Sequence, residues 1–421
     1  MSAIKVRGIK YNNDNGMLCG SVAIQGCKNS ALPILAATLL NGKANVIHNC
    51  PALSDVFVSI DILNSLGCRA VFENGTAVVD SMHTSCCNVP QRLMGAMRSS
   101  VIFAGALLSR CGRAEFTLPG GCDIGRRPID IHLAAFEKMG VEVVCNEGNV
   151  VCTVDKLHSA DIYLPLPSVG ATENIMLLAA RGKGVTRIFN AAREPEICDL
   201  QSFLNSMGAR VFGAGSSIIT IYAVRELHES NFTVMPDRIE AVTFACACAA
   251  AGGTLKLNKA QYEHMAAPMN VLGTMGLTAV PYADAVVVTA KRPMTCVPIV
   301  TTGPYPAFPT DAQSLVMSVM SCADGEGVVV ENVFENRFGH ASELGKMGAD
   351  ISVSGKRAVV RGKKLQGAVT EACDLRSGAA LVVAGLAAEG ETIVEHSEYI
   401  DRGYQDFVQK LSSIGACVER I

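Results

Sequence analysis

The sequence predicts an α/β protein with two domains, each built from three copies of one βαβαββ unit. Three observations support this fold class: the length of 421 residues, a glycine-containing pair that recurs six times, and six apolar runs long enough for buried helices. A single hydrophobic core stops growing at roughly 250–300 residues, so a chain of this length is expected to form two domains. Hydrophobic residues make up 49% and charged residues 18%, which supplies enough apolar surface for both cores.

Two glycines mark each copy of the repeat. The second follows a hydrophobic residue and recurs every 67–73 residues, and the first stands 21–28 residues before it. We expect the first glycine to end an apolar helix and to open a strand, because glycine adopts the left-handed conformation of a helix end without strain. The first glycines are Gly42, Gly112, Gly184, Gly253, Gly327 and Gly390, and the pairs are Leu66-Gly67, Met139-Gly140, Met207-Gly208, Met275-Gly276, Met347-Gly348 and Ile414-Gly415.

Each of the six apolar runs begins with polar residues. Their nearly all-apolar interiors predict helices at the centre of a domain, with the polar groups gathered at one end. A helix N-terminus is partly positive, so a cation there is unfavourable unless an anion neutralises it. If these helix starts face a common cleft, they predict a site for a small, densely anionic ligand; the alternative is that they are ordinary N-caps. The starts are Lys28-Asn29, Arg98-Ser99, Thr172-Glu173, Asp237-Arg238, Thr310-Asp311 and Asp374-Leu375-Arg376.

The composition argues against several classes of protein. The longest apolar stretch, about residues 241–251, is too short for a membrane span, and the N-terminus lacks a signal-peptide pattern, so a cytoplasmic location is expected. The 17 cysteines show no C-x-x-C spacing and the eight histidines no H-E-x-x-H, which favours reduced thiols and predicts neither a metal nor a cofactor. A net charge of −3 without a basic block argues against bulk nucleic-acid binding.

The loop 118–132 has a composition that favours chemistry. It contains three glycines, and Arg126 and Arg127 follow Cys122 within five residues. Neighbouring cations lower the pKa of a thiol from its usual value of about 8.5 and favour the reactive thiolate. We therefore predict a chemical role for Cys122. The alternative is a flexible surface loop whose arginines are simply solvated.

Asp311 is a second candidate, because three prolines stiffen the segment that leads to it, residues 303–311. A rigidly held carboxylate suits a general base, for which geometry matters before pKa. An aspartate at the start of a helix is also an ordinary N-cap, and the spacing alone does not separate the two roles. Further charges stand at expected strand-to-helix turns, in residues 334–337 and 400–404.

Together these motifs resemble the enolpyruvyl transferase family, and the resemblance covers essentially the whole chain. It implies two inside-out α/β domains with buried central helices and two crossings of the chain. The domains would be residues 1–27 with 236–421, and residues 28–235, which carry the Cys122 loop. The matching segments are GCKNSALP from Gly26, LPGGC from Leu118, SVGATEN from Ser168, AREPE from Ala192, PDRIE from Pro236, FPTD from Phe308, FENR from Phe334, DLR from Asp374 and IDRGY from Ile400.

The resemblance implies transfer of the enolpyruvyl group of phosphoenolpyruvate to the 3-hydroxyl of UDP-N-acetylglucosamine, with release of phosphate. Lys28, Arg127 and Arg402 would hold the phosphate and carboxylate of phosphoenolpyruvate, with Arg98 and Arg376 nearby. Asp311 would take the proton from the hydroxyl, and Cys122 would act as general acid or form a covalent adduct. It also implies that an epoxide of the fosfomycin type alkylates Cys122, and that neither nucleic acid nor a membrane is a partner. The other residues that it assigns to substrate binding are Asn29, Pro128, Ile129, Asp130, Ser168, Val169, Gly170, Val333, Phe334, Arg337 and Asp374.

Three alternatives remain at this point. One is transfer to shikimate 3-phosphate by the sister enzyme of the same fold, against which the 118–122 loop and Ser168–Gly170 count. The others are a non-catalytic UDP-sugar sensor and an RNA-end-processing protein with a related repeat; the mild acidity of the chain and its lack of aromatic platforms argue against the latter. Four residues depart from the family pattern: Asp123, Arg126, Ala312 and Gly339. Of these, Asp123 is an acid next to Cys122 in the sequence, and its charge would offset part of the fall in the pKa of the thiol.

Overall fold

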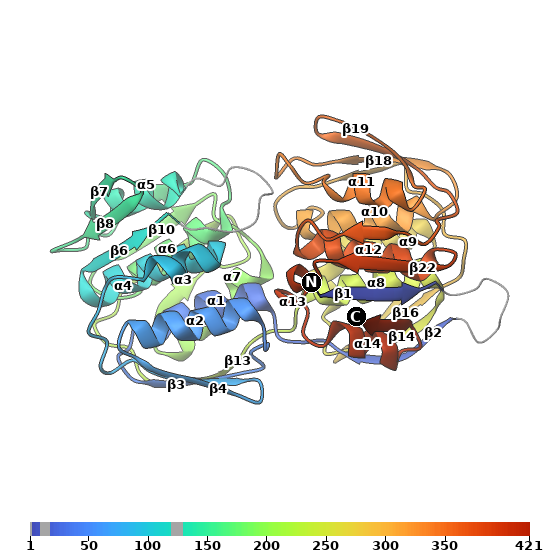
Figure 1. Cartoon of the computed structure of the whole chain (residues 1–421). Helices are drawn as coiled ribbons and strands as arrows, with labels where there is room; N and C mark the ends of the chain where they lie inside the picture. The colour runs from blue at the N-terminus through green and yellow to red at the C-terminus, as the bar shows by residue number, and fades with distance from the viewer. Residues whose placement is uncertain (1, 9–16, 119–128) are drawn as a thin grey trace. The chain divides into compact units, whose positions relative to one another are not determined.

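The computed structural model describes residues 2–8, 17–118 and 129–421, which fold into two compact units. The first unit contains the described residues up to 25 together with 236–421, and the second contains the described residues of 26–235. The chain passes from one unit to the other at residues 25–26 and 235–236 (Figure 1). The functional domains expected from the resemblance, which divide after residues 27 and 235, remain a prediction.

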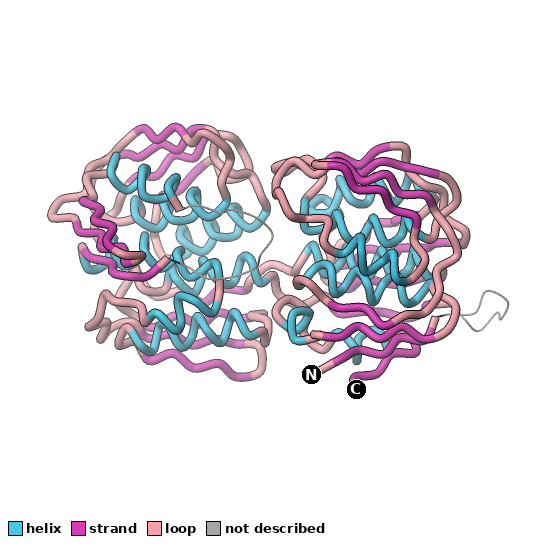
Figure 2. Tube along the Cα trace, turned by 45° about the horizontal axis from the view of Figure 1, so that its top comes forward, coloured by secondary structure: helices cyan, strands magenta, loops and turns pink. Residues whose placement is uncertain are grey.

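Three small sheets enclose the helices of each unit (Figure 2). Five of the six sheets in the described residues share one pattern, a parallel pair followed by two antiparallel neighbours. In the sixth, an isolated parallel bridge between Asn88 and Glu115 takes the place of the first strand. This common topology confirms the repeated unit predicted from the glycine spacing.

The sheets of the first unit join the two ends of the chain. Strand β1 lies between β22 and β23, and β2 pairs with β14, so strands from residues 3–23 complete sheets built from residues 253–420. The sheet orders are β21 (Val369–Glu371), β22 (Glu391–Glu395), β1 (Ala3–Arg7), β23 (Cys417–Arg420); β15 (Thr278–Tyr282), β16 (Ala285–Ala290), β14 (Gly253–Asn258), β2 (Leu18–Ala23); and β17 (Ile299–Thr301), β18 (Glu326–Val330), β20 (Arg357–Arg361), β19 (Asp350–Ser354).

The second unit is closed in the same manner, because β13 near its end pairs with β3 near its start. Its sheet orders are β13 (Asn231–Thr233), β3 (Ala44–His48), β5 (Thr76–Asp80), β4 (Arg69–Glu73); β11 (Arg210–Phe212), β12 (Ile218–Tyr222), β10 (Val185–Phe189), β9 (Asp161–Tyr163); and β6 (Arg113–Thr117), β8 (Asn149–Thr153), β7 (Glu142–Asn146).

The six predicted apolar runs form the central helices, which confirms the fold class. Every residue of α8 is buried, as expected for a helix that packs on all sides. The central helices are α1 (Lys28–Ala37), η1 with α4 (Arg98–Ile102, Phe103–Cys111), α6 (Val169–Ala179), α8 (Arg238–Ala251), η3 with α10 (Thr310–Ala312, Gln313–Ser321) and α12 (Leu375–Ala387).

The remaining helices link the strands of each unit. They are α2 (Ser54–Ser65), α3 (Gln91–Ala96), α5 (Asp130–Lys138), α7 (Pro195–Ser206), η2 (Tyr262–Met265), α9 (Ala266–Met275), α11 (His340–Lys346), α13 (Glu398–Asp401) and α14 (Phe407–Ser413). Within the three described stretches of the chain, none of the helices combines the length and apolar character that a membrane crossing requires.

Two details of the sequence prediction were wrong. Helix α6 begins at Val169 rather than at Thr172, because the Ser168 hydroxyl accepts a hydrogen bond from the Ala171 N–H and caps the helix earlier. Gly327 lies inside β18, and Gly325, with φ 102°, is the left-handed residue instead. A glycine is still needed at 327, because a Cβ there would lie 2.1 Å from the Val297 carbonyl oxygen.

The sequence predicted reduced, buried thiols, but five cysteines of the described residues are exposed: Cys19, Cys111, Cys145, Cys373 and Cys417. All 16 cysteines in the described residues are free thiols. Burial raises the pKa of Cys248 in α8 to about 12, with slight relief from a backbone hydrogen bond, and it also raises the pKa of neighbouring Cys246. Thiols of this kind are inert at neutral pH and serve as small hydrophobic side chains.

Candidate active site

In the first unit, Asp311 lies between two buried arginines. Its Oδ1 is 3.0 Å from Arg337 Nη2 and its Oδ2 is 3.4 Å from Arg376 Nε. The two arginine side chains are 4% and 3% exposed, whereas that of Asp311 is 30% exposed. The carboxylate is therefore the accessible part of a buried cluster of charges.

Three central helices of the first unit, α8, α10 and α12, begin near the Arg376 side chain. Burial would lower its pKa, but Tyr404, Asp311 and Asp237 together raise it. Its guanidinium carbon lies 5.2 Å from the centre of the Tyr404 ring, a cation–π distance. Asp237 caps α8, Asp311 precedes α10 and Arg376 opens α12, so their N-terminal ends converge within the first unit.

Arg337 connects Asp311 to two further predicted site residues. Its Nη1 lies 3.8 Å from Asp374 Oδ1, and its guanidinium carbon lies 5.9 Å from the centre of the Phe334 ring. Asp374 is fixed by a capping box with Ser377 at the start of α12. The structure thus brings together Asp311, Phe334, Arg337, Asp374 and Arg376.

Gln25 holds the segment that carries Arg402, which is half-buried at the end of α13. Its side chain donates to the Gly403 carbonyl (2.8 Å) and accepts from the Gln405 N–H (2.7 Å). Its own N–H donates to the buried Glu240 carboxylate (2.7 Å), which also pairs with Lys410. Burial raises the pKa of Glu240 to about 7, although Lys410 acts in the opposite direction.

In the second unit, Lys28 opens α1 and is neutralised by the protein itself. Its Nζ lies 3.0 Å from Asp55 Oδ2 in the first turn of α2, and its side chain is only 12% exposed. A cation at a helix N-terminus needs an anion to neutralise it, and here a carboxylate of the chain supplies that anion. Asn29, the next residue, is exposed.

His132 and Asn174 connect three other predicted site segments of this unit. The Asn174 side chain donates to His132 Nδ1 (2.8 Å) and to the Val101 carbonyl of η1 (3.1 Å). His132 Nδ1 therefore accepts, which leaves the ring hydrogen on Nε2. Burial, helped by the charge of Arg98 and opposed by Asp130, lowers the pKa of His132 to about 4. A Cβ on Gly170 would lie 3.1 Å from the His132 ring, so glycine is favoured there by close approach.

The start of α6 also carries a buried acid, Glu173. Burial, together with the nearby carboxylates of Glu196 and Glu194, raises the pKa of Glu173 well above its usual value. Thr172 accepts a hydrogen bond from the Ala192 N–H (3.1 Å), which joins α6 to the segment that leads into α7. The AREPE motif thus lies beside the SVGATEN motif in the second unit.

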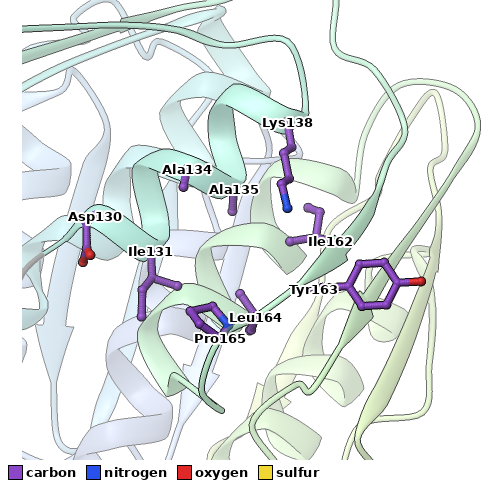
Figure 3. Close-up of a pocket in the computed structure, with 9 residues that line it drawn as sticks. All are labelled: Asp130, Ile131, Ala134, Ala135, Lys138, Ile162, Tyr163, Leu164 and Pro165. Carbon is purple, nitrogen blue, oxygen red and sulfur yellow. The ribbon is translucent and has the colours of Figure 1, made fainter.

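Asp130 lies at the rim of a pocket between α5 and the chain that runs from β9 toward α6 (Figure 3). Ile131 points toward Leu164 and Pro165, whereas the Tyr163 ring points away from the helix. Ile129, just before α5, is buried, and Ser168, Val169 and Gly170 are half-buried. Cys122, Asp123, Arg126, Arg127 and Pro128 lie outside the described residues.

Comparison with known proteins gives the family. The family model for EPSP synthase (3-phosphoshikimate 1-carboxyvinyltransferase) matches residues 13–411. The chain belongs to the EPSP synthase family. Within this family it is 48% identical over 410 residues to UDP-N-acetylglucosamine 1-carboxyvinyltransferase 2 of Caldanaerobacter subterraneus subsp. tengcongensis, covering 97% of this chain and 98% of the relative. It is 44% identical over 404 residues to UDP-N-acetylglucosamine 1-carboxyvinyltransferase of Nitratidesulfovibrio vulgaris, covering 96% and 97%.

Solved structures of EPSP synthase family members share the fold. The enolpyruvyl transferase NikO from Streptomyces tendae superposes with a TM-score of 0.88 at 26% identity, covering 100% of this chain and 98% of that one. EPSP synthase from Acinetobacter baumannii superposes with a TM-score of 0.76 at 16% identity over the full length of both chains, which supports the fold alone.

His340 gives the protein a measurable sensitivity to acid. It opens α11 beside Arg337, and burial lowers its pKa to about 4, with Asp374 acting in the opposite direction. Between about pH 6.5 and 4, the unfolded chain binds a proton at this histidine and the folded protein does not. Stability therefore falls as the pH falls through this window, by about 1.4 kcal/mol per pH unit for one such group. His132 contributes in the same direction.

We expect His340→Gln to reduce the slope of unfolding free energy against pH by about one proton in this window. Urea unfolding at several pH values between 4 and 6.5 measures the slope. His83→Gln is the matched control, because His83 is exposed. An unchanged slope in His340→Gln would show that the folded protein already protonates this ring.

Proposed function

We propose that this protein transfers the enolpyruvyl group of phosphoenolpyruvate to the 3-hydroxyl of UDP-N-acetylglucosamine, as the names of its 43–48% identical relatives suggest. The observation that carries the proposal is the cluster in which two buried arginines flank the accessible carboxylate of Asp311. Phosphoenolpyruvate needs fixed cations for its phosphate and carboxylate, and the hydroxyl needs a base. The reaction is the first committed step of peptidoglycan synthesis, and we propose that it takes place in the cytoplasm.

The chemistry begins with protonation of the methylene carbon of phosphoenolpyruvate, for which Cys122 is the proposed acid. The second carbon becomes cationic and is attacked by the 3-oxygen of the sugar, whose proton passes to Asp311. This gives a tetrahedral intermediate that carries the phosphate. Loss of a proton from the methyl group and departure of phosphate restore the double bond. Cations already in place, such as Lys28 and Arg402, stabilise the charges without reorganisation, usually the largest catalytic term.

The arginines set the strength of Asp311 as a base. With Arg337 and Arg376 at 3.0 and 3.4 Å, the carboxylate is held ionised and ready to accept a proton.

Cys122 is the proposed site of reaction with epoxides of the fosfomycin type. The proposal rests on Arg126 and Arg127, two cations close in sequence that favour the thiolate. The buried thiols of the central helices, by contrast, have raised pKa values and are not expected to react.

A phosphate-release assay with phosphoenolpyruvate and each of two acceptors tests the function. We expect release with UDP-N-acetylglucosamine, a product heavier by the enolpyruvyl group, and inhibition by fosfomycin. Release with shikimate 3-phosphate alone would replace the proposal by the sister activity. Tight binding of UDP-N-acetylglucosamine without any turnover would identify a sensor.

A further inference from the structure

Glu331 is a buried carboxylate that the sequence analysis did not single out. It follows β18 directly and is 1% exposed. Its Oε1 accepts hydrogen bonds from the Thr302 hydroxyl (2.9 Å) and from the N–H groups of Val333 (2.7 Å) and Phe334 (3.1 Å). Its Oε2 accepts from the Thr310 hydroxyl (2.9 Å). Four donors therefore converge on the two oxygens of this one carboxyl group.

The Thr302 hydroxyl completes this arrangement. It donates to Glu331 and accepts from the Asn332 N–H at 2.9 Å. Three successive N–H groups, those of Asn332, Val333 and Phe334, are therefore fixed by Glu331 and its partner. The side chains of Glu331 and Thr302, rather than backbone hydrogen bonds between strands, hold the turn 331–334. Because the Thr302 hydroxyl is itself bonded to Glu331, the shape of the turn depends on the Glu331 carboxyl group.

The same carboxylate reaches the catalytic cluster through Thr310. Thr310 precedes Asp311, which pairs with Arg337, and Arg337 lies 5.9 Å from the Phe334 ring. Glu331 is thus hydrogen-bonded both to Thr310, the neighbour of Asp311, and to the N–H groups of Val333 and Phe334. Val333 is 40% exposed, so its side chain is available to a ligand.

We propose that Glu331 is a positioning residue that sets the 3-hydroxyl of the acceptor sugar against Asp311. The inference rests on the proposed function, in which Val333 and Phe334 line the sugar site and Asp311 is the base. Glu331 itself touches neither substrate. It acts by holding the turn that binds the sugar at a fixed distance from the base, so its loss affects the sugar nucleotide rather than phosphoenolpyruvate.

Steady-state kinetics of Glu331→Gln with each substrate varied in turn tests the proposal. The amide keeps the shape of the side chain, but it replaces one acceptor oxygen with an NH2 group that can only donate, so it cannot accept all four hydrogen bonds in the same geometry. We expect KM for UDP-N-acetylglucosamine to rise roughly tenfold or more and kcat to fall, while KM for phosphoenolpyruvate stays within about twofold. Glu326→Gln, at an exposed glutamate that opens the same strand β18, is the matched control and should keep all three constants.

The outcomes separate the two proposals. A wild-type protein without turnover would contradict the proposed function. An active wild type whose Glu331→Gln variant shows equal changes in both KM values, or no change, would overturn the positioning role. If Glu331→Gln melts below the assay temperature, Thr310→Val takes its place, because it removes only the bond to Oε2. That variant should show the same selective change at smaller size, and an unselective loss would overturn the inference.

Discussion

Replacing Asp311 with asparagine is expected to slow turnover by about 10²–10⁴-fold while the protein still binds UDP-N-acetylglucosamine. The amide keeps the size of the side chain but cannot take the proton of the sugar hydroxyl. A loss of this size corresponds to about 2.7–5.5 kcal/mol of transition-state stabilisation. Phosphate release gives the turnover, and isothermal titration calorimetry gives the affinity for the sugar nucleotide.

The folded state should tolerate this change. Breaking a fully buried ion pair costs about 3–5 kcal/mol. Here the loss is smaller, because Asp311 is partly exposed and Arg337 keeps its second carboxylate, Asp374. A thermal melt checks this, and Asp324→Asn, at an exposed position, is the control. Equal losses of turnover and sugar binding in Asp311→Asn would make Asp311 a binding residue rather than the base.

The sequence predicted the repeat and the central helices because both leave a local signal. A glycine with φ 93° follows Leu66, and glycines with φ between 86° and 115° follow the methionine or isoleucine of the other five pairs. A long run of apolar residues, such as 239–251, predicts a buried helix from the sequence alone, and these residues are indeed buried in α8. The start of α6 was misplaced because its cap is a serine, which is common enough in loops to carry little information on its own.

The partners within the site could not be predicted from the sequence in the same manner. Asp311 is 26 residues from Arg337 and 65 from Arg376, so nothing local indicates that both guanidinium groups meet its carboxylate. Lys28 and Asp55 pair across two helices, and Glu331 joins segments from three parts of the unit. These pairings are set by how the sheets and helices pack, which only the fold supplies.

Because the starts of three central helices converge in the first unit, its cations and carboxylates act as one cluster. Arg376 is buried, with Asp311 on one side and the Tyr404 ring close by. A buried cation needs such partners, because an unpaired charge taken out of water is strongly destabilising. This connects the helix-start pattern of the sequence with the catalytic role proposed for Asp311.

Cys122→Ser is expected to abolish steady-state turnover or to slow it by about 10²–10⁴-fold. A serine hydroxyl is a far weaker acid than a thiol, so it does not protonate the methylene carbon efficiently, and it has no thiolate form to attack an epoxide. Phosphate release measures the first effect, and mass spectrometry of the intact protein after fosfomycin treatment measures the second.

A control variant and the possible outcomes define what this test says about the Cys122 thiol. Cys145→Ser, at an exposed cysteine of β7, is the matched control and should keep both activity and a single fosfomycin adduct. Full turnover in Cys122→Ser would remove the thiol from the catalytic steps. An adduct that persists in that variant would place the reactive cysteine elsewhere in the chain. Loss of labelling together with loss of turnover assigns both properties to the sulfur of Cys122.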